Sequence, residues 1–173
     1  MGDYYRRFDT VADFKATWLS EAKMTRSYFE HLTDESLKQP IADGFMNLGD
    51  LAWHLVTSIP GLVRENGLDI PLPTNHKETP EKVSEIITTF DQLSNKLLEE
   101  IDAKWNDETL VTVDKMWGAF DWPKWLALAM LVAHQGHHRG QMTVLMRQAG
   151  LKVPGVYGPS KEEMEQYASP SES

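Results

Sequence analysis

Apolar residues recur every three or four positions in four long stretches, which is the spacing of helices that bury one face. The first stretch covers about residues 10–32, and the second begins near Asn47. The third opens at Thr79, and the fourth covers about residues 123–149. Four amphipathic helices of this length predict an all-α fold, a four-helix bundle with long connections.

Local signals indicate where these helices begin and end. Asn47 followed by Asp50 resembles a capping box, with Asp in place of the usual Glu or Gln. Residues 79–81 offer a threonine cap, a proline at the first helical position and an early acid for the third helix. Pro60 should kink the second helix, and Gly150 should stop the fourth.

Two long connections join the predicted helices. Residues 66–79 are rich in proline, and residues 106–122 include a segment, 109–113, that is expected to be extended. Long connections near the end of a bundle often form the walls of a site. Residues 1–168 are expected to form a single domain, followed by a disordered tail at 169–173.

Composition excludes several kinds of chemistry. The chain of 173 residues has no cysteine, which rules out disulfides, thiolate nucleophiles and Cys-ligated zinc. A net charge of −9 disfavours nucleic acid as a partner. The longest apolar run, residues 125–133, is too short to span a bilayer. Because the first residues lack the apolar core of a signal peptide, a cytoplasmic protein is expected.

The most informative residues are the histidines of the fourth helix. His134 and His138 lie four positions apart, so both stand on one helix face about 6 Å apart along the axis. At about 100° per residue, His138 falls in the middle of the apolar stripe and His137 at its edge. Two inward imidazoles at this spacing can reach one metal ion, although two buried, hydrogen-bonded histidines would show the same pattern.

A metal site needs a third protein ligand. His54 lies beside the apolar stripe of the second helix and can point into the bundle, whereas His31 and His76 are weaker candidates. A three-histidine site leaves positions open for water or substrate, which is typical of catalytic zinc. Asp50, one turn before His54, either orients that ring or only caps the helix.

Other residues near the histidines allow two interpretations each. Gln141 falls near the histidines and either hydrogen-bonds a ligand ring or a metal-bound water, or makes an ordinary polar contact within the helix. Arg139 points away, as an ion-pairing or helix-packing residue. Gly140 costs helix stability, so close approach of another helix is expected there. Six large side chains form either ordinary core or an apolar cavity beside the metal: Trp53, Trp117, Trp122, Trp125, Met116 and Met130.

The chain resembles the DinB/YfiT-like superfamily of metal-binding helical bundles. The resemblance rests on a lone His54 in the second helix, on the pattern His-x-x-x-His-Arg-Gly-Gln from His134 to Gln141, and on the ending at 150–158. It implies that His54, His134 and His138 bind a divalent metal, often zinc or nickel. It also implies a homodimer, and some relatives are transferases or isomerases that use low-molecular-weight thiols.

Together these observations predict a metal-dependent enzyme that acts on a small molecule, either a thiol S-transferase or a hydrolase, with its catalytic residues unassigned. The alternative is a non-catalytic metal or small-ligand binding module of a stress response. The expected partners are a small substrate, a low-molecular-weight thiol and a second copy of the chain, with neither nucleic acid nor membrane. The first and third helices are the expected source of the dimer face.

Overall fold

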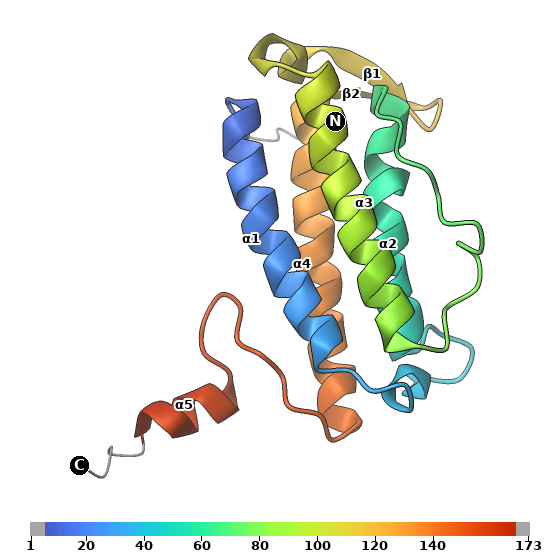
Figure 1. Cartoon of the computed structure of the whole chain (residues 1–173), viewed down its shortest axis with the longest axis vertical. Helices are drawn as coiled ribbons and strands as arrows, with labels where there is room; N and C mark the ends of the chain where they lie inside the picture. The colour runs from blue at the N-terminus through green and yellow to red at the C-terminus, as the bar shows by residue number, and fades with distance from the viewer. Residues whose placement is uncertain (1–5, 169–173) are drawn as a thin grey trace.

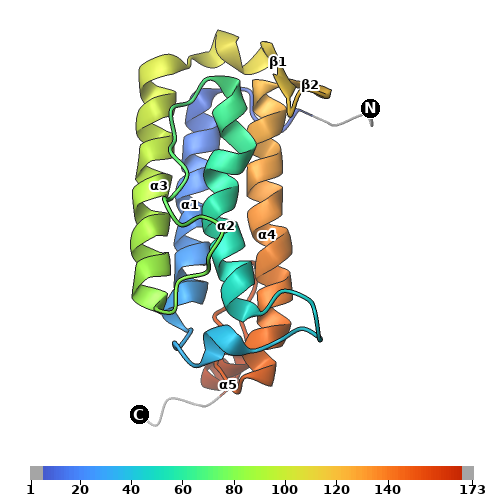
Figure 2. The same ribbon diagram turned by 90° about the vertical axis from the view of Figure 1, so that its right-hand side faces the viewer.

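Four long helices lie side by side in the computed structural model, which describes residues 6–168 (Figures 1 and 2). The helix α2 packs against α3 and α4, and α1 packs against the same two helices. A short fifth helix, α5, lies outside the four-helix core at the C-terminal end (Figure 1) and is joined to α4 by the ion pair between Arg147 and Glu162. The bounds are α1 Val11–Glu30, α2 Leu48–Val63, α3 Val83–Lys104, α4 Lys124–Gln148 and α5 Lys161–Ala168.

A small antiparallel hairpin, β1 (Val113–Met116) and β2 (Phe120–Pro123), precedes α4. Three short 3-10 helices complete the fold: η1 Ser36–Lys38, η2 Arg64–Asn66 and η3 Asp107–Val111. The described residues thus hold five α-helices and a two-stranded sheet, a helical fold but not the four-helix, strictly all-α chain that we expected. The expected tail at 169–173 lies outside the described residues.

The connection between α3 and α4 differs from its prediction. Residues 109–111, expected to be extended, belong to η3, whereas the backbone is extended from Thr112 and the strand β1 begins at Val113. The Asn106 side chain accepts the backbone N–H of Thr109 at 3.0 Å, so it caps this short helix. A local side-chain cap therefore outweighed the β propensity of the Thr–Leu–Val–Thr–Val run.

Capping explains most of the other helix ends. The predicted capping box of α2 is present, with Asn47 and Asp50 each accepting the other's backbone N–H, and α2 continues past Pro60 to Val63. Gly150 follows α4 with φ +74°, a left-handed conformation that suits glycine. The expected start of α3 at Thr79 is wrong, because α3 begins at Val83, whose N–H donates to the carboxylate of Asp34 at 2.9 Å.

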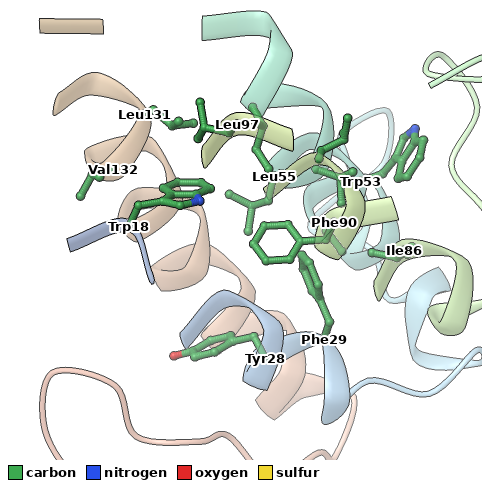
Figure 3. Close-up of a cluster of buried hydrophobic side chains, with 14 of the residues drawn as sticks. Trp18, Tyr28, Phe29, Trp53, Leu55, Ile86, Phe90, Leu97, Leu131 and Val132 are labelled. Carbon is green, nitrogen blue, oxygen red and sulfur yellow. The ribbon is translucent and has the colours of Figure 1, made fainter. Parts of the chain in front are cut away.

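The core lies between the four long helices (Figure 3). Phe29 of α1 meets Phe90 of α3 edge to face, with ring centroids 5.4 Å apart. Trp18 is fully buried and satisfies its indole N–H on the Ser94 hydroxyl at 2.9 Å. Both contacts join α1 to α3. Among the described helices, none is both long and apolar enough to cross a membrane.

Candidate metal centre

Three histidines meet where α2 and α4 face each other. His54 comes from α2, and His134 and His138 come from successive turns of α4. One nitrogen of each ring lies within 4.8 Å of the others. The Nε2 atoms of His54 and His134 are 2.8 Å apart. The structure therefore brings together the three residues that the sequence singled out.

The environment keeps these imidazoles neutral. Burial lowers the pKa of His54, and the neighbouring charge of His138 lowers it further. Burial lowers the pKa of His134 to about 4, and repulsion from His138, His54 and His137 in their protonated forms contributes to the shift. Burial also lowers the pKa of His138. The unprotonated ring is the form that binds a metal ion, so the cluster is ready for one at neutral pH.

Gln141 orients one of the rings. Its amide oxygen lies 2.6 Å from Nδ1 of His138, and its amide nitrogen lies 3.2 Å from Nε2 of His137. Because an amide oxygen can only accept a hydrogen bond, Nδ1 of His138 carries the proton and Nε2 keeps its lone pair. The predicted contact between Gln141 and a histidine of the cluster is confirmed, and it fixes the tautomer suited to coordination.

The donor set suits a divalent cation. Zinc bonds imidazole nitrogen at about 2.0–2.1 Å, which for tetrahedral angles places two such nitrogens about 3.3 Å apart. The separations here, from 2.8 Å up to 4.8 Å, bracket that value. Without a metal, the facing Nε2 atoms of His54 and His134 can share one proton in a hydrogen bond. A metal ion between them would accept the Nε2 lone pairs of both rings. Three nitrogens leave coordination positions free for another molecule.

The weaker candidates lie elsewhere. Nδ1 of His31 contacts the Ser27 carbonyl oxygen at 2.8 Å, and Nδ1 of His76 contacts the Pro73 carbonyl oxygen at 3.2 Å. Both therefore satisfy local backbone. The carboxylate of Asp50 accepts hydrogen bonds from the Asn47 N–H and the Thr79 hydroxyl, so helix capping accounts for it and it does not orient His54. His137 is exposed at the flank of the cluster, as predicted.

A cleft of about 580 Å³ opens beside His54 and His134. One wall is the hairpin, which contributes Trp117, Phe120 and Trp122. The helices α2 and α4 contribute the rest: Thr57, Ser58, Gly61, Leu62 and Met130. This volume lies within the range of about 300–1,000 Å³ that is typical of ligand pockets.

The predicted cavity set is therefore half right. Trp117, Trp122 and Met130 line the cleft. Trp53 and Met116 are buried instead, and Trp125 packs against the core. Sequence reasoning missed Phe120, Leu62 and Gly61; Phe120 stands within the aromatic-rich segment 117–125 and could have been included on that signal.

Comparison with known proteins agrees with the geometry. The DinB family model matches residues 8–172. This chain belongs to the DinB family. An uncharacterised protein of Bacillus subtilis strain 168, YrdA, is 41% identical over 156 residues, covering 90% of this DinB chain and 93% of YrdA.

Solved structures show the same DinB fold. A DinB-like protein from Bacillus cereus ATCC 10987 superposes with a TM-score of 0.82 at 39% identity, covering 87% of this chain and 99% of that one. The DinB-like protein YjoA from Bacillus subtilis gives a TM-score of 0.64 at 19% identity, covering 83% and 96%. The second likeness concerns the fold alone.

The DinB helix α4 also carries a buried ion pair behind the cluster. Arg139 is 1% exposed and pairs with Glu21 of α1, which is 5% exposed. The Arg139 guanidinium also donates to the Thr25 hydroxyl at 2.8 Å and to the Tyr157 hydroxyl at 2.6 Å. The predicted ion-pairing role of Arg139 is confirmed. Sequence reasoning missed Glu21, although it lies on the same helix stripe as Trp18 and Thr25.

A second polar chain continues from this pair toward α2. The Thr25 hydroxyl donates to the side-chain oxygen of Gln135 at 3.0 Å, and the Gln135 amide nitrogen donates to the Leu55 carbonyl at 2.9 Å. These bonds hold α4 against α1 and α2 next to His54 and His134. The expectation for Gly140 is wrong: it is exposed, and a Cβ added there meets nothing within 4 Å.

Proposed function

We propose that this DinB protein is a metal-dependent enzyme for small molecules, with His54, His134 and His138 as the ligands of one divalent ion. The observation that supports this proposal is the convergence of three neutral imidazoles at one side of an aromatic-walled cleft. Zinc and nickel are the metals that the family resemblance implies, and imidazole ligands suit both ions.

A bound ion would supply Lewis acidity and would lower the pKa of a water or thiol that it binds. The chain itself would do two things. Gln141 would hold the ring of His138 with its Nε2 lone pair exposed. The cleft beside His54 and His134 would hold the second reactant close to the ligand cluster.

Of the two reaction classes, thiol S-transfer is favoured over hydrolysis. Among the described residues the cleft holds no carboxylate or lysine, and the neutral hydroxyls of Thr57 and Ser58 are too weakly basic to activate water for hydrolysis. Thiol transfer needs no general base after ionisation: the thiol proton goes to solvent, the sulfur pair forms the bond to an electrophilic carbon, and the leaving group departs with its bonding pair.

The second candidate is a non-catalytic metal or small-ligand binding module of a stress response. The lining of the cleft favours this candidate, because among the described residues it holds no carboxylate or lysine that could act as a general acid or base. It would keep the metal and the cleft but show no turnover with any thiol and electrophile.

Metal analysis of protein purified without an affinity tag tests the shared part of both candidates. We expect one divalent ion per chain, with most of it lost in His54→Ala, His134→Ala and His138→Ala. The matched control is His137→Ala, which removes an exposed histidine of the same helix and should keep the metal. Loss in the control together with retention in His138→Ala would show that the ligand set is wrong.

Cobalt substitution separates the two candidates. Sulfur ligation adds a charge-transfer absorption that water and imidazole do not give. We expect glutathione, bacillithiol or mycothiol to produce this band with the cobalt protein and not with the metal-free protein. An unchanged spectrum with all three at millimolar concentration would remove the thiol-transferase proposal and leave the hydrolase or the binding module.

A further inference from the structure

The cleft beside the histidines has an unusual chemical character. Three aromatic rings from the hairpin, together with Leu62 and Met130, make most of its wall. Among the described residues, no Lys, Arg, Asp or Glu lines it. Away from the histidines, a charged group placed there would lose hydration without gaining a counter-charge, at a cost in free energy. We propose that the cleft binds an uncharged, flat apolar molecule, such as a substituted arene, as the second reactant.

The backbone conformation of the hairpin turn indicates that Trp117 has a functional role in the cleft. The Ala119 N–H donates to the Met116 carbonyl at 3.0 Å, and the two central residues, Trp117 and Gly118, have φ of +48° and +67°. This is the pattern of a type I′ turn, which favours Asn-Gly and places a tryptophan in a strained left-handed conformation. Among the described residues, Trp117 is the only one other than glycine whose φ is positive. Strain of this kind often marks functional sites.

The strained conformation puts an aromatic ring where it lines the cleft. Trp117 meets Trp122 edge to face at 5.2 Å between centroids and Phe120 at 6.2 Å. Trp117 and Phe120 nevertheless stay 48% and 54% exposed. Their rings therefore keep free surface that a flat ligand can cover. Burying such surface stabilises a complex by about 25 cal/mol per Å².

The hairpin is also held in place beside the cleft. The backbone N–H of Trp117 donates to the carboxylate of Glu65 in η2, directly after α2. Figure 2 shows the hairpin beside the end of α4 where that helix begins. An aromatic wall that is anchored in this way is preformed, so less free energy is spent on ordering the hairpin when a ligand binds.

This inference rests on the proposed function in one respect only: it places the reacting atom of the ligand at the end of the cleft near His54 and His134. The same lining assigns different places to the two reactants of a thiol transfer. Glutathione and bacillithiol carry carboxylates, and away from the histidines no side chain of the cleft offers a positive charge to pair with them. The apolar electrophile would therefore occupy the cleft, and the charged part of such a thiol would lie outside it.

Gly61 offers a way to close the cleft without touching a histidine. It lies on α2 two turns after His54 and lines the cleft, and a Cβ added there meets nothing within 4 Å. Gly61→Leu should fill the space while keeping the helix. Gly140→Leu is the matched control, because Gly140 is also a helical glycine with open space at its Cβ but does not line the cleft.

The experiment measures binding of two fluorescent probes to the full chain, with metal content measured in parallel. Phenyl-naphthylamine is an uncharged arene, and anilinonaphthalene sulfonate is the same skeleton with a negative charge. We expect the uncharged probe to bind at least tenfold more tightly than the sulfonate. Gly61→Leu should weaken its binding at least tenfold with unchanged metal content, and Gly140→Leu should leave it unchanged.

A second variant guards against misfolding of Gly61→Leu. Trp117→Asn removes one wall and supplies the residue that the turn prefers, so it should fold and still bind the uncharged probe at least threefold more weakly. Equal affinity for both probes, or wild-type binding by Gly61→Leu and Trp117→Asn, would overturn the inference. Histidine variants that lose metal but still bind the probe leave it standing, whereas a wild-type protein without metal contradicts the proposed function alone.

Discussion

The buried ion pair between Glu21 and Arg139 gives a sharp prediction about stability. Glu21→Gln keeps the size of the side chain but leaves the charge of Arg139, which is 1% exposed, without its partner. Breaking one side of a buried pair costs about 3–5 kcal/mol. The hydroxyls of Thr25 and Tyr157 still accept from the guanidinium, so we expect the lower end, about 3 kcal/mol. For a chain of this size that lowers Tm by about 6–12 °C.

The measurement is urea unfolding of metal-free protein, followed by circular dichroism. Asp102→Asn is the matched control, since it breaks the exposed pair that Asp102 forms with Lys15 and should cost at most about 1 kcal/mol. Glu21→Gln combined with Arg139→Met removes the orphaned charge and should be less destabilised than Glu21→Gln alone. If Glu21→Gln costs no more than the control, the charge of Arg139 is solvated and the argument fails.

Three further predictions concern acid and assembly. Protons compete with a metal for the imidazoles, so the ion should leave progressively as pH falls from neutral toward 4, measured by metal retained after dialysis; full occupancy at pH 4 would point to carboxylate ligands. Hydrogen bonds from Lys104 and Lys96 lower the pKa of Glu100 to about 2, so its stabilisation is complete above about 4.5 and is lost as pH falls through about 2. Glu100→Gln should therefore be less stable than wild type at pH 7, and urea unfolding at several pH values should show the gap closing in acid. Light scattering should give a homodimer at micromolar concentration, and a monomer there would remove that claim.

Much of the helical pattern could be predicted because it depends on local spacing. The capping box of α2 and the glycine after α4 are encoded within a few residues, and both are present. The facing of His134 and His138 follows from the period of one helix. Their meeting with His54 depends on how two helices are rotated toward each other, which the period of either helix alone does not determine.

The errors fall where distant parts of the chain decide the outcome. Thr79 has every local mark of a helix cap, yet its hydroxyl donates to Asp50, and α3 begins later. Glu21 is a polar residue that the sequence pattern places among core positions, and only its pairing with Arg139 explains it. Phe120 lines the cleft because the hairpin turns back on itself, whereas the sequence pattern predicted only a long connection there.

The cap of α3 has a consequence for the order in which this chain folds. The carboxylate of Asp34 accepts the Val83 N–H from 49 positions earlier in the sequence, and Lys82 donates to the same carboxylate at 2.9 Å. A helix normally nucleates with a cap from its own sequence, but the first turn of α3 receives its cap only after the end of α1 has docked beside it. Helix start and tertiary contact therefore form in one cooperative step, and the Val83 amide should exchange with solvent through global unfolding instead of local fraying.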